Sequence, residues 1–196
     1  VASFDLPYHG ESALPGIEGL TGIAQAMARG EDVFTGLQAT GRALLDRCLE
    51  GGLADASHLL VSGTSRGALA ALHLMAGDPR ILAACAHVPV THLPLLAEFH
   101  GLENNPILQR SNAEALIPRL ADRAVFLAMG SSDPRVSAER CFEFYARLQA
   151  ASRRKPPLLF CAAGQSHGDT YPGEAGYQAG AAFLLREGAE LMKNPA

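Results

Sequence analysis

The segment Leu59-Leu60-Val61-Ser62-Gly63-Thr64-Ser65-Arg66-Gly67-Ala68 decides the fold of this chain. Its first three residues are an apolar run that predicts a buried strand, and good helix formers follow Gly67. Between them lies the pattern Gly-x-Ser-x-Gly, with Ser65 at its centre. A strand that turns into a helix within about five residues forces its central residue into a strained backbone conformation. We therefore expect Ser65 to lie on a sharp turn that exposes its hydroxyl.

Two features of this turn favour chemistry at Ser65. Gly63 and Gly67 are expected to remove Cβ atoms that would otherwise collide within the turn. The helix that starts after Ser65 directs its first amides, among them the backbone N–H of Arg66, toward a position where negative charge would develop. We expect the side chain of Arg66 to face solvent. The alternative is an ordinary structural turn, in which the serine has no chemical role.

Composition limits the class of protein. The 196 residues suffice for one globular domain with a substantial core, and 48% of hydrophobic residues is typical of such a domain. A formal net charge of −4 without a basic stripe argues against nucleic acid as a partner. No apolar run approaches the ~20 residues of a membrane-spanning helix, so we expect no membrane partner.

The cysteine pattern argues against metal binding. Cys48, Cys85, Cys141 and Cys161 are widely spaced, lie in apolar segments and form no Cys-x-x-Cys pair or Cys/His cluster. The sequence therefore predicts no metal site and no cofactor. We expect all four to be small buried side chains in a reducing compartment, which predicts a cytoplasmic protein.

Strands and helices are predicted to alternate along the chain. Apolar runs predict strands over 1–6, 81–88, 124–129 and 158–162, in addition to the strand before Ser65. Helical patterns cover 20–27, 31–49 and 176–186, and Ser137 is expected to cap a further helix that carries Cys141, Phe142, Tyr145 and Leu148. This alternation predicts the α/β class, with a mostly parallel sheet and helices on both faces.

The segment 89–123 interrupts the alternation. It is irregular, contains four prolines and has only short helical patterns, such as 112–120. A long insertion of this kind after a strand predicts a small lid over a pocket. The sequence therefore predicts a single domain over 1–196, with a lid-like insertion at 89–123 within it.

Three predicted strand ends carry residues suited to nucleophilic catalysis. They are Ser65, Asp133 and His167, in this order along the chain. Chemistry in parallel sheets gathers at the carboxyl ends of the strands, so the three side chains are expected to meet. Each also has a structural alternative, since Asp133 before proline is typical of a plain turn and a loop histidine is commonly a surface residue.

The order Ser, Asp, His together with the Gly-x-Ser-x-Gly turn resembles the α/β-hydrolase superfamily. The segment 5–10 resembles the loop after the fourth strand of that fold, Gly130-Ser131-Ser132-Asp133-Pro134-Arg135-Val136 resembles its acid turn, and Ser166-His167-Gly168 resembles its histidine loop. Among the branches, the chain looks most like the dienelactone-hydrolase and prolyl-oligopeptidase-like enzymes. The resemblance implies a three-layer α/β-hydrolase fold, in which Ser65 is the nucleophile, His167 the general base and Asp133 the residue that orients the histidine.

The resemblance also has a gap at the N-terminal end. By this alignment the first three strands of the fold are missing, so we expect the domain to be N-terminally incomplete. The loop that normally supplies one oxyanion-hole amide is missing with them, and Arg66 N–H is the other donor. An exposed sheet edge would remain, which makes an upstream segment or a partner chain, including a homo-oligomer, an expected neighbour.

These observations predict a serine hydrolase that cleaves a carboxylic ester, or a small amide or short peptide, through acylation of Ser65. Thr64 and His92 are expected to contact the substrate. The small ester or short peptide is the partner that this reading implies. Two alternatives stay open, namely an inactive binding module of the same fold and an acyltransferase that uses an acceptor other than water.

Overall fold

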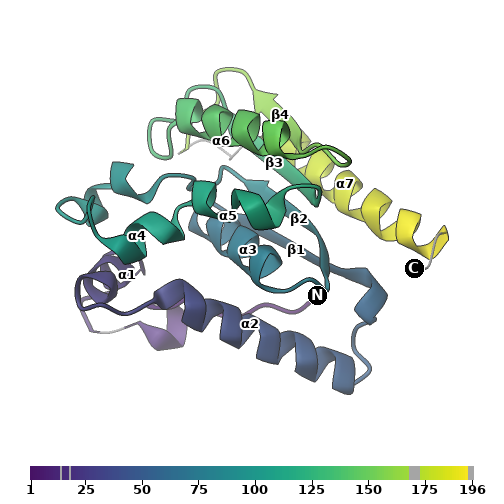
Figure 1. Cartoon of the computed structure of the whole chain (residues 1–196), viewed down its shortest axis with the longest axis horizontal. Coiled ribbons are helices and arrows are strands. Elements are labelled where there is room, and N and C mark those ends of the chain that lie inside the picture. The colour runs from purple at the N-terminus through teal and green to yellow at the C-terminus, as the bar shows by residue number, and fades with distance from the viewer. Residues whose placement is uncertain (14, 18, 168–172, 194–196) are drawn as a thin grey trace.

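A computed structural model of the chain describes residues 1–13, 15–17, 19–167 and 173–193, with side chains up to residue 189. Its centre is a four-stranded parallel sheet with the order β1-β2-β3-β4 (Figure 1). The strands are β1 (Leu59–Thr64), β2 (Ile81–His87), β3 (Ala124–Gly130) and β4 (Leu158–Ala162). The prediction of a parallel α/β sheet is confirmed.

The burial of each strand follows its place in the sheet. All seven residues of β3 are buried, and so are all residues of β2 except Leu82. These strands lie in the middle of the sheet with helices on both faces, which explains why their sequences are uninterrupted apolar runs. The edge strand β4 has exposed residues, among them Cys161. The expectation that every cysteine is buried is therefore wrong for Cys161, and Cys48 is only half-buried.

Seven α-helices and four short 3₁₀ turns connect the described strands. The helices are α1 (Gly19–Ala28), α2 (Val33–Glu50), α3 (Arg66–Gly77), α4 (Pro106–Ser111), α5 (Ala113–Leu120), α6 (Ala138–Ala151) and α7 (Gly173–Lys193). The 3₁₀ turns are η1 (Gly10–Ser12), η2 (Ala56–His58), η3 (Leu93–Leu95) and η4 (Ala97–Phe99).

The helices cover both faces of the sheet and complete three layers (Figure 1). On one face, α3 packs on β1 and β2, and α6 packs on β3, within the larger of two hydrophobic clusters. Small residues of α3, namely Ala68, Ala70 and Ala71, are almost fully buried, which lets this helix lie close to the sheet. On the other face, α7 covers β2, β3 and β4, and Phe183 packs on Phe126 with ring centroids 5.5 Å apart.

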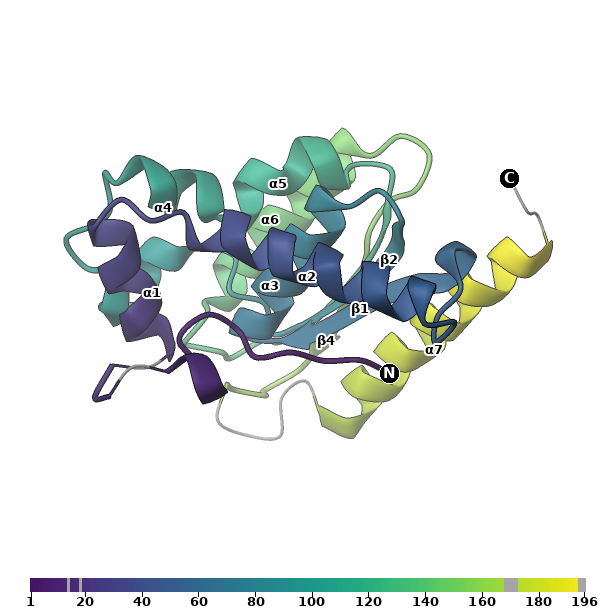
Figure 2. The ribbon, with the colours of Figure 1, turned by 90° about the horizontal axis from the view of Figure 1, so that it is seen from below.

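Residues 1–6 do not form the strand that the sequence predicts. They are extended but take part in no ladder with the described strands, and most of them are exposed. Figure 2 shows this segment as a purple trace alongside α2, and Val1, Ala2 and Phe4 line a groove together with residues of α2 and β1. An apolar alternating run becomes a strand only when a neighbouring strand pairs with its backbone, and β1 does not do so here.

The buried face of α6 also differs from the prediction. Ser137 caps the helix as expected, since its side chain accepts a hydrogen bond from Arg140 N at 3.3 Å. The buried residues, however, are Cys141, Phe144 and Leu148, whereas Phe142 is 42% exposed. Positions three and seven residues after Cys141 lie on its own side of the helix, as expected for a helix with one buried face, and Tyr145 is partly buried beside them.

The segment 89–123 folds into η3, η4, α4 and α5. It contributes its own buried residues to the larger cluster, including Phe99, Leu108 and Leu116. The side chain of Asn112 accepts a hydrogen bond from Leu93 N at 2.8 Å and ties η3 to the start of α5. Contacts between α5 and α3, and between η4 and α1, fix the segment above the end of the sheet where β1 leads into α3.

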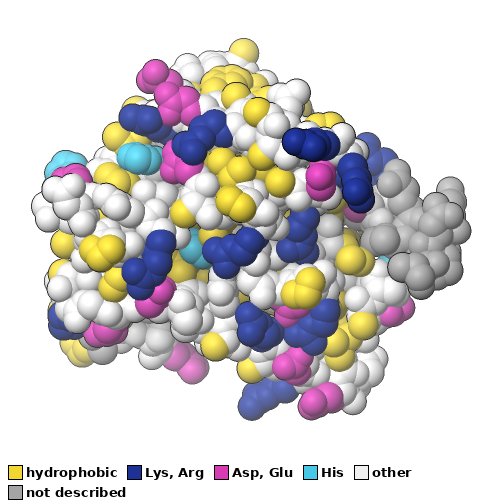
Figure 3. All heavy atoms as spheres, viewed as in Figure 1, with side chains coloured by type: hydrophobic (Ala, Val, Ile, Leu, Met, Phe, Trp, Pro, Cys, Tyr) yellow, Lys and Arg dark blue, Asp and Glu magenta, His cyan; other side chains and the backbone are white. Residues whose placement is uncertain are grey.

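Charged side chains of both signs are interspersed on the face of the molecule shown in Figure 3. Within the described part of the chain, no helix is long and apolar enough to cross a membrane.

Candidate active site

Ser65 lies on a strained turn between β1 and α3. Its backbone has φ 56° and ψ −119°, a combination that residues other than glycine rarely adopt. The backbone N–H of Ser65 donates to His87 O at 2.8 Å, which fastens the turn to the end of β2. The backbone N–H of Arg66 is the first amide of α3 and therefore has no acceptor within the helix.

Gly63 and Gly67, on either side of Ser65, differ in how much space a side chain would have. A Cβ atom on Gly63 would lie 2.0 Å from Gly67 O, so no side chain fits at this position. A Cβ atom on Gly67 would meet no atom within 4 Å. The expectation that both glycines prevent collisions is therefore correct for Gly63 and wrong for Gly67, because only Gly63 faces the backbone of the first helical turn.

Asp133 follows β3 and is almost completely buried. Its side chain is 1% exposed, and its Oδ1 atom accepts hydrogen bonds from Arg135 N at 2.9 Å and Val136 N at 3.1 Å. Two backbone donors fix the carboxylate plane, and the second oxygen is left to a different partner. The local sequence Asp-Pro-Arg-Val thus folds as a tight turn around the aspartate, rather than presenting it to solvent.

The loop after β4, which carries His167, is fastened to the turn after β3. Ser132 N donates to Gln165 O at 3.0 Å, and Ser131 N donates to Ala162 O at 2.9 Å. A Cβ atom on Gly130 would lie 2.2 Å from Gln165 O, so only glycine permits this approach. The two loops therefore hold Asp133 and His167 in a common frame. Gly168, which belongs to the predicted histidine loop, lies outside the described residues.

The three side chains meet at the carboxyl ends of the strands. Ser65 Oγ lies 3.2 Å from His167 Nε2, and His167 Nδ1 lies 2.8 Å from Asp133 Oδ2. With the proton assigned to Nδ1, the histidine donates to the carboxylate and its Nε2 atom accepts from the serine. This arrangement allows the histidine to take a proton from the serine while the aspartate stabilises the resulting imidazolium.

A pocket of about 300 Å³ opens above Ser65. It is lined by Leu20, Thr64, Ser65, Arg66, Val90, Leu96, Arg135, Val136 and His167. Thr64 therefore lies where the sequence predicts a substrate contact, and its hydroxyl is 3.4 Å from the hydroxyl of Tyr177. His92 does not line the pocket. Its Nδ1 atom lies 3.7 Å from Glu114 Oε2 within the segment 89–123, so the prediction of a substrate contact has no support in the geometry.

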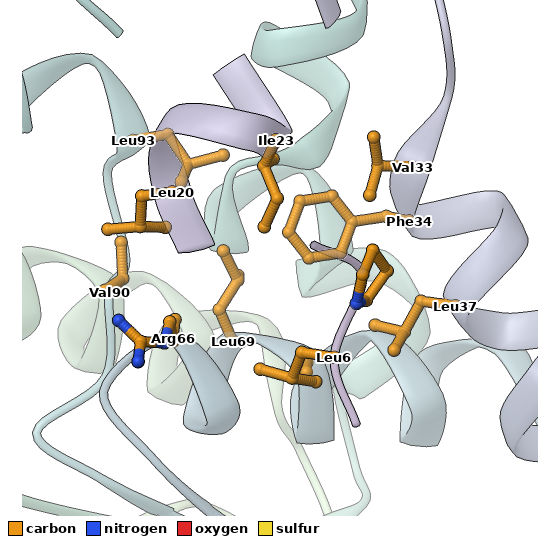
Figure 4. Close-up of a pocket in the computed structure, with 12 residues that line it drawn as sticks. Leu6, Leu20, Ile23, Val33, Phe34, Leu37, Arg66, Leu69, Val90 and Leu93 are labelled. Carbon is orange, nitrogen blue, oxygen red and sulfur yellow. The ribbon is translucent and has the colours of Figure 1, made fainter. Parts of the chain in front are cut away.

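A narrow apolar recess adjoins this pocket. Leu20, Arg66 and Val90 line both spaces, and the recess continues between α1, α2 and α3. Figure 4 shows Ile23, Phe34 and other apolar side chains converging on it, with the guanidinium of Arg66 beside Leu20 and Val90. Its cavity volume is about 10 Å³, which is the room of about one water molecule, so any larger group must displace side chains to enter.

An ion pair between Arg135 and Glu98 lies beside the pocket. Arg135 Nη2 donates to Glu98 Oε1 at 2.5 Å and connects the acid turn to η4. Partial burial on its own would raise the pKa of the Glu98 carboxyl. The hydrogen bond from Arg135, with the charges of Arg135 and Arg66, outweighs burial and holds that pKa below its usual value. The carboxyl of Glu98 is therefore a carboxylate at neutral pH.

Two buried thiols near the sheet are not activated as nucleophiles. Burial raises the pKa of Cys85 and the pKa of Cys141 to about 12, so both are protonated at neutral pH. Among the residues with described placement, no group of three His, Cys, Asp or Glu side chains is arranged to hold a metal ion.

Sequence reasoning missed the residues that hold the two loops together. Gly130 and Ser131 were read only as part of a turn, although Ser131 Oγ also accepts a hydrogen bond from Gly164 N at 2.9 Å. The run Gly130-Ser131-Ser132 at the end of β3 is typical of an ordinary turn, so the sequence contains no signal for this role. The pairing of Glu98 with Arg135 had no signal in the sequence, because 37 positions separate the two residues.

Solved structures of other proteins share this architecture. The structure of TT1662 from Thermus thermophilus is similar with a TM-score of 0.71 and 19% identity, over 94% of this chain and 75% of that chain. The Pyrococcus furiosus esterase Pf2001 is similar with a TM-score of 0.64 and 22% identity, over 94% and 69% of the two chains. A Mycobacterium tuberculosis puromycin-hydrolyzing peptidase has a TM-score of 0.59 and 22% identity, over 77% of this chain.

The fold, the serine turn and the order of the three strand-end residues define an α/β-hydrolase-fold protein. More narrowly, the chain belongs to the prolyl oligopeptidase family, whose family model matches residues 42–187. The match to the puromycin-hydrolyzing peptidase covers 24% of the length of that protein. No curated protein sequence matches the chain.

Proposed function

We propose that this protein is a serine hydrolase that cleaves a carboxylic ester through an acyl-enzyme on Ser65. The observation that carries the proposal is the hydrogen-bonded series Ser65 Oγ, His167 Nε2, His167 Nδ1 and Asp133 Oδ2, with distances of 3.2 and 2.8 Å. Membership of the prolyl oligopeptidase family supports a serine hydrolase in general.

The first half of the reaction acylates the serine. His167 Nε2 removes the proton of the Ser65 hydroxyl as its oxygen attacks the carbonyl carbon of the ester. Negative charge then develops on the former carbonyl oxygen, and Arg66 N–H, at the N-terminal end of α3, is positioned to donate to it. When this intermediate collapses, the imidazolium of His167 returns the proton to the departing alcohol.

The second half removes the acyl group. A water molecule gives a proton to His167 Nε2 and attacks the acyl carbon, and the bond to Ser65 Oγ breaks as the proton returns to that oxygen. Asp133 stabilises the imidazolium in both halves and keeps the proton of Nδ1 in place. The backbone donors to Asp133 Oδ1 prevent its carboxylate from rotating away.

An inactive binding module of the same fold is the second candidate. It is favoured by one observation: Arg66 N–H is the single oxyanion donor that the turn at Ser65 supplies directly. Removing one donor of an oxyanion hole typically lowers the rate by ~10²–10³-fold. A module without a second donor would still bind a ligand in the pocket above Ser65.

An ester and an amide with the same acyl group test the proposed reaction. We expect 4-nitrophenyl butyrate to be hydrolysed with a kcat/KM at least about 100-fold above that of butyryl 4-nitroanilide, because the phenolate leaves far more readily. The Ser65→Ala protein supplies the background rate for each substrate. Comparable rates for the two substrates would indicate a peptidase, and no rate above background for either would favour the binding module.

A further inference from the structure

The charged residues that line the pocket above Ser65 are both positive. Its charged lining residues are Arg66 and Arg135, and both carry a guanidinium. Arg135 is neutralised by its ion pair with Glu98. Among the ion pairs of the described residues, Arg66 has none, so it is the guanidinium of this pocket that has no ion-pair partner.

The side chain of Arg66 reaches across the pocket rather than away from it. Its backbone belongs to the first turn of α3, but its Nη1 atom would lie 3.9 Å from a Cβ atom on Gly19 at the start of α1. Its charge also contributes to the lowered pKa of Glu98 on η4. The expectation that this side chain simply faces solvent is therefore incomplete: Arg66 is exposed, but it borders both the pocket and the recess (Figure 4).

We propose that Arg66 selects substrates that carry a carboxylate close to the reacting carbonyl group. The inference rests on the proposed function, and it adds the chemical class of the acyl group. Arg66 follows Ser65 directly in the chain and lines the same pocket, so an anion paired with its guanidinium lies near the acyl carbon. A guanidinium presents a planar fork of donors that matches the two oxygens of a carboxylate.

The apolar surroundings strengthen this selection. Leu20, Val90 and Leu96 line the pocket beside Arg66. An ion pair in such a setting is screened less than one on an open surface. A cationic acyl group at the same position meets the unpaired guanidinium, because the carboxylate of Glu98 is already paired with Arg135.

Substrate pairs that differ only in charge test the proposal. We would compare the α-ethyl esters of N-acetyl-glutamate and N-acetyl-glutamine, and the corresponding aspartate and asparagine esters, by following ethanol release. For at least one pair, we expect kcat/KM of the anionic ester to exceed that of the neutral ester by about tenfold, as a charge-assisted hydrogen bond provides. Raising the salt concentration should lower this ratio.

Substitutions of Arg66 test whether its side chain causes the preference for the anionic ester. Arg66→Gln should bring the ratio of anionic to neutral kcat/KM to about one, and Arg66→Lys should retain part of the preference. Arg110→Gln is the matched control, because Arg110 is an exposed arginine paired with Asp32 and lies outside the pocket. It should keep the wild-type ratio. A wild-type ratio near one for both pairs, or an unchanged ratio in Arg66→Gln, would overturn the proposal.

A binding measurement separates this proposal from the proposed reaction. In the Ser65→Ala protein, the α-ethyl ester of N-acetyl-glutamate or of N-acetyl-aspartate should bind about tenfold more tightly than the α-ethyl ester of its amide counterpart, and Arg66→Gln should remove the difference. If no ester is hydrolysed but this difference in Kd is found, the hydrolase proposal fails and the selection by Arg66 stands. If esters are hydrolysed and the Kd values are equal, the selection by Arg66 fails and the hydrolase stands.

Discussion

The two ends of β1 each carry a serine, a histidine and an aspartate in contact. At the start of the strand, Ser57 Oγ and Asp55 Oδ2 both approach the same atom, His58 Nδ1, at 2.7 and 3.1 Å. At the other end, Ser65 and Asp133 approach opposite nitrogens of His167. A proton can pass from serine to histidine with support from the aspartate only in the second arrangement.

The two clusters also differ in how they are built. Asp55 and His58 are three positions apart, and the aspartate caps η2 by accepting from Ser57 N at 2.8 Å. Its side chain is 66% exposed, whereas that of Asp133 is 1% exposed. Local capping therefore brings the same residue types together without the burial and the separate strand ends that a catalytic arrangement needs. A serine, a histidine and an aspartate in contact are therefore not enough to define a catalytic site. What matters is that the serine and the aspartate contact different nitrogens of the histidine.

Removing each serine gives the largest expected contrast. Ser65→Ala should lower kcat/KM for 4-nitrophenyl butyrate by about 10⁴-fold or more, because the nucleophile is lost. Ser57→Ala removes the same hydroxyl group from the cluster at the start of β1 and should leave kcat/KM within about twofold. Steady-state kinetics of both variants measure the contrast, and equal losses would contradict the assignment.

The two aspartates provide the next contrast. Asp133→Asn keeps the shape of the side chain but removes the charge that stabilises the imidazolium and sets the tautomer of His167. We expect kcat to fall by about 10³- to 10⁴-fold. Asp55→Asn should keep wild-type kinetics, since Asp55 caps η2 and contacts His58 and Ser57 outside the pocket. If Asp133→Asn retained more than about a tenth of the activity, Asp133 would have no catalytic role.

Alanine substitutions of the two glycines around Ser65 test whether only Gly63 must lack a side chain. Gly63→Ala places a Cβ atom against Gly67 O and should lower the free energy of unfolding by about 2–4 kcal/mol. Gly67→Ala meets open space in a helical position and should change it by less than about 1 kcal/mol, in the stabilising direction. Urea unfolding of the two variants measures both values. A Gly67→Ala loss as large as that of Gly63→Ala would refute the steric argument.

A buried histidine should make the stability of the protein depend on pH. His73 stacks on Phe34 and bonds to Ser111 O, and burial lowers its pKa to about 4. The unfolded chain binds the proton near pH 6.5, so stability is present above that pH and is lost as the pH falls toward 4. The loss is at most about 3 kcal/mol.

The variant His73→Gln tests this dependence. It should be less stable at pH 7 but should lose less further stability between pH 6.5 and 4 than the wild type. Urea unfolding at several pH values measures the slope for each protein. An equal slope in the two proteins would mean that another group is responsible for the loss.

The sequence predicted the parts of the fold that depend on local patterns. The apolar runs located β2, β3 and β4, and the glycine and serine pattern located the strained turn at Ser65. The segment 1–6 has the same kind of apolar pattern but no paired neighbour, and the prediction of a strand there is wrong. Periodicity reports which face a segment can bury, but pairing depends on residues elsewhere in the chain.

The sequence predicted only those residues of the candidate site that directly follow a strand. Ser65, Asp133 and His167 follow from the rule that strand ends gather chemistry in a parallel sheet. His92 also lies near a strand end, but the structure turns it toward Glu114 instead of the pocket. The contacts of Arg66 depend on where α1 and η4 come to rest, and no pattern within the chain indicates that position.

Labelling with a fluorophosphonate probe tests the central claim most directly. Such a probe phosphonylates only a serine that is activated by a neighbouring base. We expect one labelled peptide, with the label on Ser65 and none on Ser57, and no labelling in the His167→Ala protein. A label on Ser57, or a Ser65 label that persists without His167, would contradict the account.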